Sequence, residues 1–244
     1  MALVLKDVDL RVKKAIAHYW RTQAHQSKKN KTTGKKDQGD RGNKTGGKHM
    51  DGFIHLFKSV LVENGMPGAD IYSDNKLEIP GFFRPTKKWD IVVVHKCQLI
   101  AALELKSQSG SVGNNFNNRT EEAIGNAQDL LTAFREKAFK TSQKPWMGTL
   151  ILLEDSEDAT RPVGVREPHF PAFKEFLGTS YAKRYELMLR KLVLERLYDN
   201  AVLLLSRADA GKRGLYAEPA ADLGMKHCLA ALAGRVGTFF AAQS

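Results

Sequence analysis

The chain has 244 residues, of which 42% are hydrophobic, and this length allows one large domain with a sizeable core. Its 38 Lys and Arg residues exceed its 27 Asp and Glu, and the resulting net charge of +11 indicates an anionic partner, with nucleic acid ahead of a membrane surface. The two cysteines, Cys97 and Cys228, lack the spacing of a zinc site or a disulfide framework, and no apolar run has the length of a membrane span or a signal core, so we expect a cytoplasmic protein.

Apolar residues at helical spacing predict a first helix from Asp7 to about Ala24, within an N-terminal part of residues 1–25. Residues 26–50 contain five glycines and almost nothing apolar, so we expect this segment not to fold alone. Its charges are nearly all positive, which favours a flexible arm that binds DNA phosphates, with a solvated linker as the alternative. The basic residues of the arm are Lys28, Lys29, Lys31, Lys35, Lys36, Arg41, Lys44 and Lys48.

Residues 51–160 carry the pattern of a catalytic core. A second helix is predicted over 51–64, with Asp51 as its N-cap. Glu63, at the end of this helix, could assist an active site, although a surface glutamate is the simpler interpretation. A first strand is predicted before the next apolar run, followed by a basic turn, and Glu78 on that strand is a second candidate for the same accessory role.

Two apolar runs, residues 91–94 and 99–105, predict a pair of β-strands joined by a short polar turn. Asp90 lies at the start of the first strand, and in an antiparallel hairpin it falls almost directly opposite Glu104 on the second strand. Two adjacent carboxylates repel each other and raise each other's pKa unless a cation lies between them. The hairpin therefore predicts a site for one shared ion.

Side chains alternate along a strand, so Glu104 and Lys106 project from one face, and we expect Ile100 and Ala102 behind them on that face. A solvated strand end, the alternative, would place polar residues there. An Asp, a gap and then Glu-x-Lys resembles the motif of PD-(D/E)xK nucleases. A divalent ion can polarise a phosphoryl oxygen and lower the pKa of a water, while Lys106 would hold that water or the charge that develops on the phosphate.

Residues 107–119 are predicted to form a polar loop beside this motif. Amide side chains can bond adenine edges in the major groove, and arginine can bond guanine, so we interpret the loop as a DNA contact, with a flexible turn-rich loop as the alternative. Its candidate DNA-binding residues are Gln108, Asn114, Asn115, Asn117, Asn118 and Arg119.

An amphipathic helix followed by a buried strand over 147–153 predicts a βαβ crossover, and Gln128 on this helix is a third candidate for an accessory role. The pattern is helical over 168–206 and again over 223–234. We therefore expect residues 161–244 to be a helical part of the same domain that serves core packing and dimerisation.

The run Lys-Lys-Trp-Asp-Ile-Val-Val-Val and the block from Glu104 to Arg119, with the basic arm ahead of them, resemble the XhoI family of type II restriction endonucleases. The resemblance implies an α/β, PD-(D/E)xK restriction-endonuclease-like core with a central mixed sheet flanked by helices. It also implies a homodimer that binds double-stranded DNA, uses Mg²⁺ and cuts the palindrome CTCGAG after its first cytosine, leaving 5′ overhangs.

By motif position, the resemblance implies that Asp90, Glu104 and the backbone carbonyl of Leu105 are metal ligands and that Lys106 is the catalytic cation. Trp89 stands where the motif usually has proline, which offers no metal ligand. Two other interpretations stay open: a repair or structure-specific nuclease of the same fold, and a DNA-binding module with a decayed site. The intact Asp90, Glu104 and Lys106 argue against decay.

Overall fold

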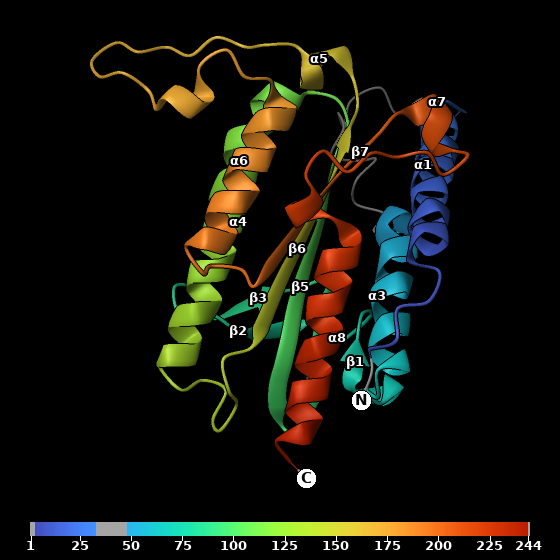
Figure 1. Ribbon diagram of the computed structural model, residues 1–244, viewed down its shortest axis with the longest axis vertical. Helices are drawn as coiled ribbons and strands as arrows, with labels where there is room; N and C mark the ends of the chain where they lie inside the picture. Colours follow the sequence, from blue (N-terminus) through green and yellow to red (C-terminus); the bar gives the residue numbers. More distant parts are fainter. Residues whose placement is uncertain (1–2, 33–47, 244) are drawn as a thin grey trace.

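The computed structural model describes residues 3–32 and 48–243, with side chains described over 3–26 and 48–243. A five-stranded sheet lies between two layers of helices, as Figure 1 shows. This arrangement confirms the expected α/β class with a central mixed sheet flanked by helices.

The sheet has the strand order β1-β4-β5-β6-β7. The pairs β1–β4 and β4–β5 are antiparallel, whereas β5–β6 and β6–β7 are parallel. Parallel neighbours need crossover connections, and helices supply both of them here. The strands are β1 (Ile71–Tyr72), β4 (Ile91–His95), β5 (Gln98–Gln108), β6 (Trp146–Glu154) and β7 (Asn200–Ser206).

The predicted hairpin is present as β4 and β5. Lys96 and Cys97 form its turn with φ values of 46° and 62°, the left-handed region that a two-residue hairpin turn requires. A register shift pairs Val93 with Ala101 but Val94 with Leu99, so Ile100 is the extra residue of a bulge.

The bulge corrects one expectation about the face of β5. Ala102 packs in the apolar cluster on the face that Glu104 and Lys106 share, as predicted, but Ile100 packs in the cluster on the opposite face. A bulged residue shifts the alternation of side chains by one position, and the shift moves Ile100 across the sheet.

Helices α1 (Val8–Thr32), α3 (Asp51–Glu63) and α8 (Met225–Ala241) cover one face of the sheet, while α4 (Val112–Arg135) and α6 (Tyr181–Leu194) cover the other (Figure 1). Short helices complete the chain. They are η1 (Lys48–Met50), η2 (Gly68–Asp70), α5 (Glu157–Thr160), η3 (Lys174–Phe176), α7 (Ala208–Gly211) and η4 (Ala221–Leu223).

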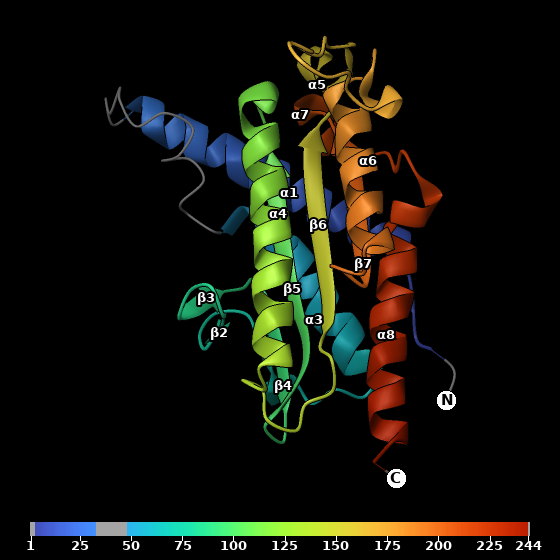
Figure 2. The same cartoon turned by 90° about the vertical axis from the view of Figure 1, so that its left-hand side faces the viewer.

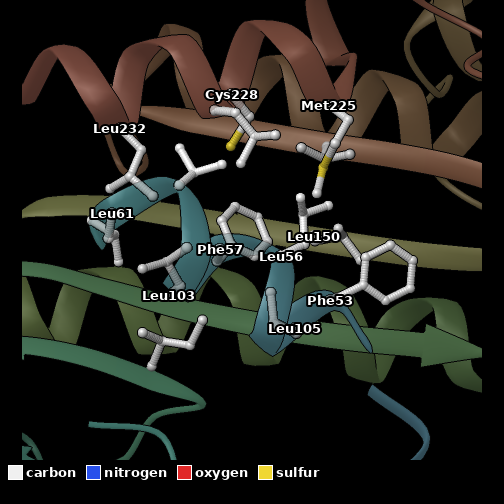
Figure 3. Close-up of a cluster of buried hydrophobic side chains, with 14 of the residues drawn as sticks. Phe53, Leu56, Phe57, Leu61, Leu103, Leu105, Leu150, Met225, Cys228 and Leu232 are labelled. Carbon is white, nitrogen blue, oxygen red and sulfur yellow. The ribbon is translucent and has the colours of Figure 1, made fainter. Parts of the chain in front are cut away.

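The hydrophobic core on the α3 side fixes which side chains of β5 point to which face of the sheet. Figure 3 shows aromatic and aliphatic side chains of α3 packed between α8 and the strands β5 and β6. Phe53 and Phe57 are 0% and 1% exposed. Each such phenylalanine contributes about 1.5–3 kcal/mol to folding by its burial. Leu103 and Leu105 pack in this cluster, so Glu104 between them points to the other face.

The structure corrects several predicted boundaries. The first helix continues to Thr32, into the segment that we expected not to fold, and residues 33–47 of that segment lie outside the described part. Asp51 is the first residue of α3 and not its cap, because Met50 holds that position without a side-chain hydrogen bond. The final helix extends to Ala241, past its predicted end at residue 234.

Two predicted connections are regular elements instead, and part of one predicted helix is a strand. Residues 112–119 form the first turns of α4, not a loop. Residues 200–206, predicted as helix, are the buried strand β7, so the C-terminal part is not purely helical. The basic turn before Asp90 contains the strand β3 (Thr86–Lys88), which pairs with β2 (Glu78–Pro80).

The β2–β3 hairpin forms a separate two-stranded sheet. In Figure 2 it stands out on the left of the molecule, on the same side as the far end of α1. Among the described residues, no helix is both long enough and apolar enough to cross a membrane.

Candidate active site

Asp90 and Glu104 lie opposite each other, one position beyond the last residue pair of the β4–β5 ladder. The ladder ends at Ile91 opposite Leu103, and the amide of Asp90 donates to the carbonyl oxygen of Leu103 at 3.1 Å. The next residue pair is therefore Asp90 and Glu104, as predicted from the sequence. Glu104 is 5% exposed, so its carboxylate has left water and needs charged partners.

The site lies on an open edge of β5. On one side, β5 pairs with β6 as far as Gln108. On the other side, β4 begins at Ile91 opposite Leu103, so β4 does not pair with the part of β5 that follows Leu103. Asp90 closes part of this edge, because its Oδ2 accepts from the amide of Leu105 at 2.6 Å. Within a strand, the N–H and C=O of one residue point to the same edge. The carbonyl of Leu105 therefore faces the same side as Asp90, where it can serve as the third ligand that the motif implies.

Burial and the neighbouring Glu104 raise the pKa of Asp90 from 3.8 to about 6, against the lowering effect of the Leu105 amide and the nearby lysines. Burial alone would lower the pKa of Lys106, but the contact with Glu104 raises it above its ordinary value. Two carboxylates and a lysine that keeps its charge are therefore concentrated at one point.

Lys106 links Glu104 on the sheet to Glu122 on helix α4. Its Nζ donates to Glu104 Oε1 at 2.6 Å and lies 4.0 Å from Glu122 Oε2. Arg119, one helical turn before Glu122, pairs with the same carboxylate at 2.6 Å. The α4 turns that carry Arg119 and Glu122 thus face the C-terminal half of β5 across the site.

A second lysine, which the sequence did not indicate, contacts the same glutamate. Lys87 on β3 donates from Nζ to Glu104 Oε2 at 2.6 Å, and its side chain is only 10% exposed. Its ammonium also lies 4.4 Å from the centre of the Trp89 ring. The pair Lys87-Lys88 looks like an ordinary basic turn in the sequence, and only the pairing of β3 with β2 directs Lys87 inwards.

A pocket of about 240 Å³ opens between these groups. Asp90, Leu105, Lys106 and Ser107 line it from the sheet, and Arg119 lines it from α4. The opposite wall consists of His49, Met50 and Ile54, from η1 and the start of α3. The pocket thus brings together Asp90, Lys106 and Arg119 in a space that a phosphate group could enter, while Glu104 is not among the residues that line it.

The three accessory candidates do not reach the pocket. Glu63 lies at the far end of α3 from Ile54, where it forms an ion pair with Arg11. Glu78 is exposed and pairs in register with Lys88, while its neighbour Ile79 pairs with Lys87. Because Lys87 points towards Glu104, the alternation of side chains directs Glu78 away from it. The amide of Gln128 donates to Thr132 on its own helix at 3.2 Å.

The predicted DNA-binding residues separate into three groups. Gln108 is fully buried and donates to the carbonyl of Gly110, so it cannot reach DNA in this structure. Lys48 is exposed, whereas the side chains of Lys28, Lys29 and Lys31, and all of Lys35, Lys36, Arg41 and Lys44, lie outside what the structure describes. The third group lies on the first turns of α4 and consists of Asn114, Asn117 and Asn118, which are exposed, and Asn115 and Arg119, which are half-buried.

The donor set suits a hard divalent cation. In the described parts of the chain, no group of three or more His, Cys, Asp and Glu side chains that could hold a metal ion is found. An ion here would therefore be held by the carboxylates of Asp90 and Glu104 with the carbonyl of Leu105. Oxygen ligands and an incomplete protein coordination shell are what Mg²⁺ prefers, since it usually keeps several waters.

Comparisons with known proteins identify close relatives. A family model described as restriction endonuclease XhoI matches residues 29–218. The type II restriction enzyme BstVI of Geobacillus stearothermophilus is 50% identical over 215 residues, which are 86% of this chain and 96% of that protein. The type II restriction enzyme XhoI of Xanthomonas vasicola is 43% identical over 200 residues, 80% of this chain and 79% of that protein. AbrI of Azospirillum brasilense, also a type II restriction enzyme, is 44% identical over 70% of this chain and 77% of its own length. No solved structure matches.

Proposed function

This chain belongs to the XhoI family of type II restriction endonucleases, and we propose that it hydrolyses both strands of double-stranded DNA at C/TCGAG, with Mg²⁺, leaving 5′ overhangs. The observation that carries the chemistry is the placement of Asp90 opposite Glu104 with Lys106 at 2.6 Å from Glu104. The recognition sequence follows from the resemblance of the block between Glu104 and Arg119 to this family.

A divalent ion at this site would polarise the phosphoryl oxygen and lower the pKa of the attacking water. Asp90, which immediately precedes β4, and Glu104 on β5 would hold it from the two sides of one hairpin. Asp90 is itself fixed by the amide of Leu105, so one ligand position is set by backbone geometry and not by a mobile side chain.

Lys106 supplies a fixed positive charge beside the reacting phosphate. An ammonium group has three N–H donors, and the contact with Glu104 occupies one of them. Its side chain is 32% exposed and lines the pocket, so the other donors can orient the attacking water or stabilise the charge that develops on the phosphate.

We propose that Arg119 contacts a phosphate and not a base edge. It lines the pocket beside Asp90 and Lys106 and forms an ion pair with Glu122. The exposed asparagines on the first turns of α4 are the better candidates for base contacts. They are Asn114, Asn117 and Asn118.

We also propose that the enzyme acts as a homodimer. One chain supplies one set of catalytic residues, and two sets related by two-fold symmetry match the two strands of a palindrome. The apolar stripe of α6, including Tyr185 and Leu189, is buried within the protomer, so this stripe serves core packing and is not itself exposed to a second protomer. A monomeric mass on cognate duplex in analytical ultracentrifugation would contradict this proposal.

The test is cleavage of a supercoiled plasmid with one CTCGAG site, compared with a plasmid in which one base pair of that site is changed. We expect linear product only from the first plasmid and only with Mg²⁺, with ends that map after the first cytosine. Glu104→Gln should lower the rate at least about a hundredfold by removing a ligand, at unchanged site-specific binding. Glu78→Gln, an exposed glutamate of the adjacent hairpin, is the matched control and should cut at the parent rate.

A nuclease that reads DNA structure would instead cut branched or damaged duplexes without regard to the CTCGAG site. A DNA-binding module with a decayed site would leave both plasmids uncut in the presence of Mg²⁺. Either result would refute the proposed function.

A further inference from the structure

Glu104 has an ion pair on each of its two oxygens. Lys106 Nζ is 2.6 Å from Oε1, and Lys87 Nζ is 2.6 Å from Oε2. Only Lys106 belongs to the nuclease motif. Lys87 comes from the separate β2–β3 sheet and has no role in the reaction described above, yet it is the more deeply buried of the two lysines, with 10% of its side chain exposed against 32%.

Several contacts hold Lys87 against Glu104. Its ammonium donates to the carbonyl of Lys88 at 2.8 Å and lies over the buried Trp89 ring. These contacts replace most of the water that a lysine would otherwise keep.

The hairpin that presents Lys87 is fixed to α4 at its tip. The buried carboxylate of Asp129 accepts from the amides of Phe82 and Phe83 at 2.6 and 2.8 Å and from Arg84 Nε at 2.6 Å. Arg84 also donates to Asn126 at 2.6 Å. The hairpin therefore fixes the backbone position from which the side chain of Lys87 reaches Glu104.

This arrangement conflicts with ion binding. A divalent cation shared by Asp90 and Glu104 needs at least one oxygen of Glu104, and both oxygens carry a lysine. A fixed ammonium within hydrogen-bond distance of a ligand oxygen also repels a second cation at that oxygen. One lysine has to withdraw, and Lys106 is the one that the reaction needs to stay.

We propose that Lys87 is a placeholder cation, which neutralises Glu104 in the ion-free protein and competes with the divalent ion for Oε2. This inference rests on the proposed function, since it concerns the same carboxylates. The long side chain of Lys87 can leave Glu104 by changing rotamers while β3 keeps its place, so no rearrangement of the sheet is required. The contact orients the carboxylate of Glu104, and it lowers the affinity of the free protein for the ion.

The experiment measures ion affinity in the full-length protein without DNA, so it does not depend on cleavage. The protein is titrated with Mn²⁺, and the concentration of free Mn²⁺ is measured by electron paramagnetic resonance. Binding that is present in the parent and lost in Glu104→Gln is assigned to the site of Asp90 and Glu104. We expect Lys87→Met and Lys87→Gln to bind this ion about tenfold more tightly than the parent. Lys87→Arg keeps the competing charge and should bind at close to the parent affinity.

Lys88→Met is the matched control. Lys88 is exposed and pairs opposite Glu78 on the other face of the same short strand, so this variant removes one positive charge from the hairpin without touching Glu104. It should leave the affinity for Mn²⁺ unchanged within about twofold, because an exposed charge is largely screened. Thermal unfolding of each variant identifies any variant that is not folded. If Lys87→Met does not fold, Lys87→Gln takes its place in the comparison.

Affinity that stays at the parent value or falls in Lys87→Met and Lys87→Gln would overturn the inference, since Lys87 would then be neutral towards the ion or would support it. Equal tightening in Lys88→Met would also overturn it, as a general charge effect. If neither the parent nor a Lys87 variant binds an ion that Glu104→Gln loses, the placeholder is refuted. The proposed function fails by a different result, namely Mg²⁺-dependent cleavage at the parent rate by Glu104→Gln.

Discussion

The carboxylate of Asp90 is expected to make the ion-free protein less stable than it would be without that charge. Asn can replace Asp90 with little change of shape, and its side-chain carbonyl can still accept from the Leu105 amide. The substitution removes both causes of the raised pKa, namely burial of the charge and repulsion by Glu104. We therefore predict that Asp90→Asn abolishes cleavage and at the same time stabilises the fold.

The size of the effect follows from the pKa of Asp90, which is raised from 3.8 to about 6. At about 1.36 kcal/mol per pKa unit, this shift corresponds to a penalty of about 3 kcal/mol on the folded, ionised state. The penalty is absent well below pH 3.8, where the carboxyl is protonated in both states, and it is still small at pH 4. It grows as the pH rises towards 6 and is constant above that value.

The assay is unfolding of parent and Asp90→Asn in EDTA at pH 4, 6 and 8. The variant should exceed the parent by less than about 1 kcal/mol at pH 4 and by up to about 3 kcal/mol at pH 8, which for a chain of this length raises Tm by up to about 10 °C. Asp74→Asn neutralises an exposed aspartate and should change stability little at any of these pH values.

Two results would refute this reasoning. A variant that is less stable than the parent at pH 8 would show that the carboxylate of Asp90 is favourably solvated or paired in the ion-free protein. A gain of equal size at pH 4 and pH 8 would show that the stabilisation does not come from the charge.

Three further outcomes can be measured. Arg84→Ala leaves the buried Asp129 without its cationic partner, so stability should fall by about 1–3 kcal/mol and limited proteolysis should cut the hairpin tip sooner. In Gly113→Ala the new Cβ would lie 2.7 Å from Tyr181 Oη; unfolding should show a loss of about 1–3 kcal/mol, and Tyr181→Ala in the same chain should restore most of it. Replacing five lysines of the basic arm by Ser should flatten log K against log salt by roughly four to five units in binding isotherms, with cognate preference retained; they are Lys28, Lys29, Lys31, Lys35 and Lys36.

The catalytic hairpin could be predicted because its determinants are local. A β-branched run, a two-residue turn and an antiparallel register place Asp90 opposite Glu104 without reference to the rest of the chain. The bulge at Ile100 could not be predicted in this way. It adds one residue to one strand, and no residue type in the run distinguishes a bulged from a regular position.

Strand β7 was missed because its residues suit a helix equally well. The segment Ala201–Leu205 is a continuous apolar run of Ala, Val and Leu, and periodicity alone cannot separate a buried strand from a buried helix. The partner strand β6 decides the outcome. Arg196, with φ at 58°, lies in the connection that turns the chain from α6 towards the sheet.

The start of α4 was predicted as a loop for a comparable reason. Asparagine is a poor helix former, and four of them occur between residues 114 and 118. Val112 is buried, and the rings of Phe116 and Tyr185 pack edge to face with their centroids 5.1 Å apart. This packing against α6 outweighs the unfavourable propensity and places the asparagines on a rigid element beside the site.

The charges around the pocket suggest why the ion and the phosphate should bind together. Asp90, Glu104 and Glu122 are opposed by Lys87, Lys106 and Arg119, and the ion pairs among them join the two sides. With all three carboxylates ionised, their charges balance those of the two lysines and the arginine, and the set has no net charge. A neutral, partly desolvated pocket attracts neither a phosphate nor a divalent cation strongly on its own.

With a divalent cation present the same pocket carries an excess of two positive charges, and a phosphodiester supplies one negative charge to it. Each ligand then improves the site for the other, and by linkage the coupling is reciprocal. If Lys87 leaves Glu104 as the ion enters, its charge becomes available on the same hairpin as the exposed Lys88 and Arg84, next to where the DNA backbone would lie. Ion and DNA should therefore bind with positive cooperativity, and Lys87→Met should weaken that cooperativity by giving the ion its site without DNA.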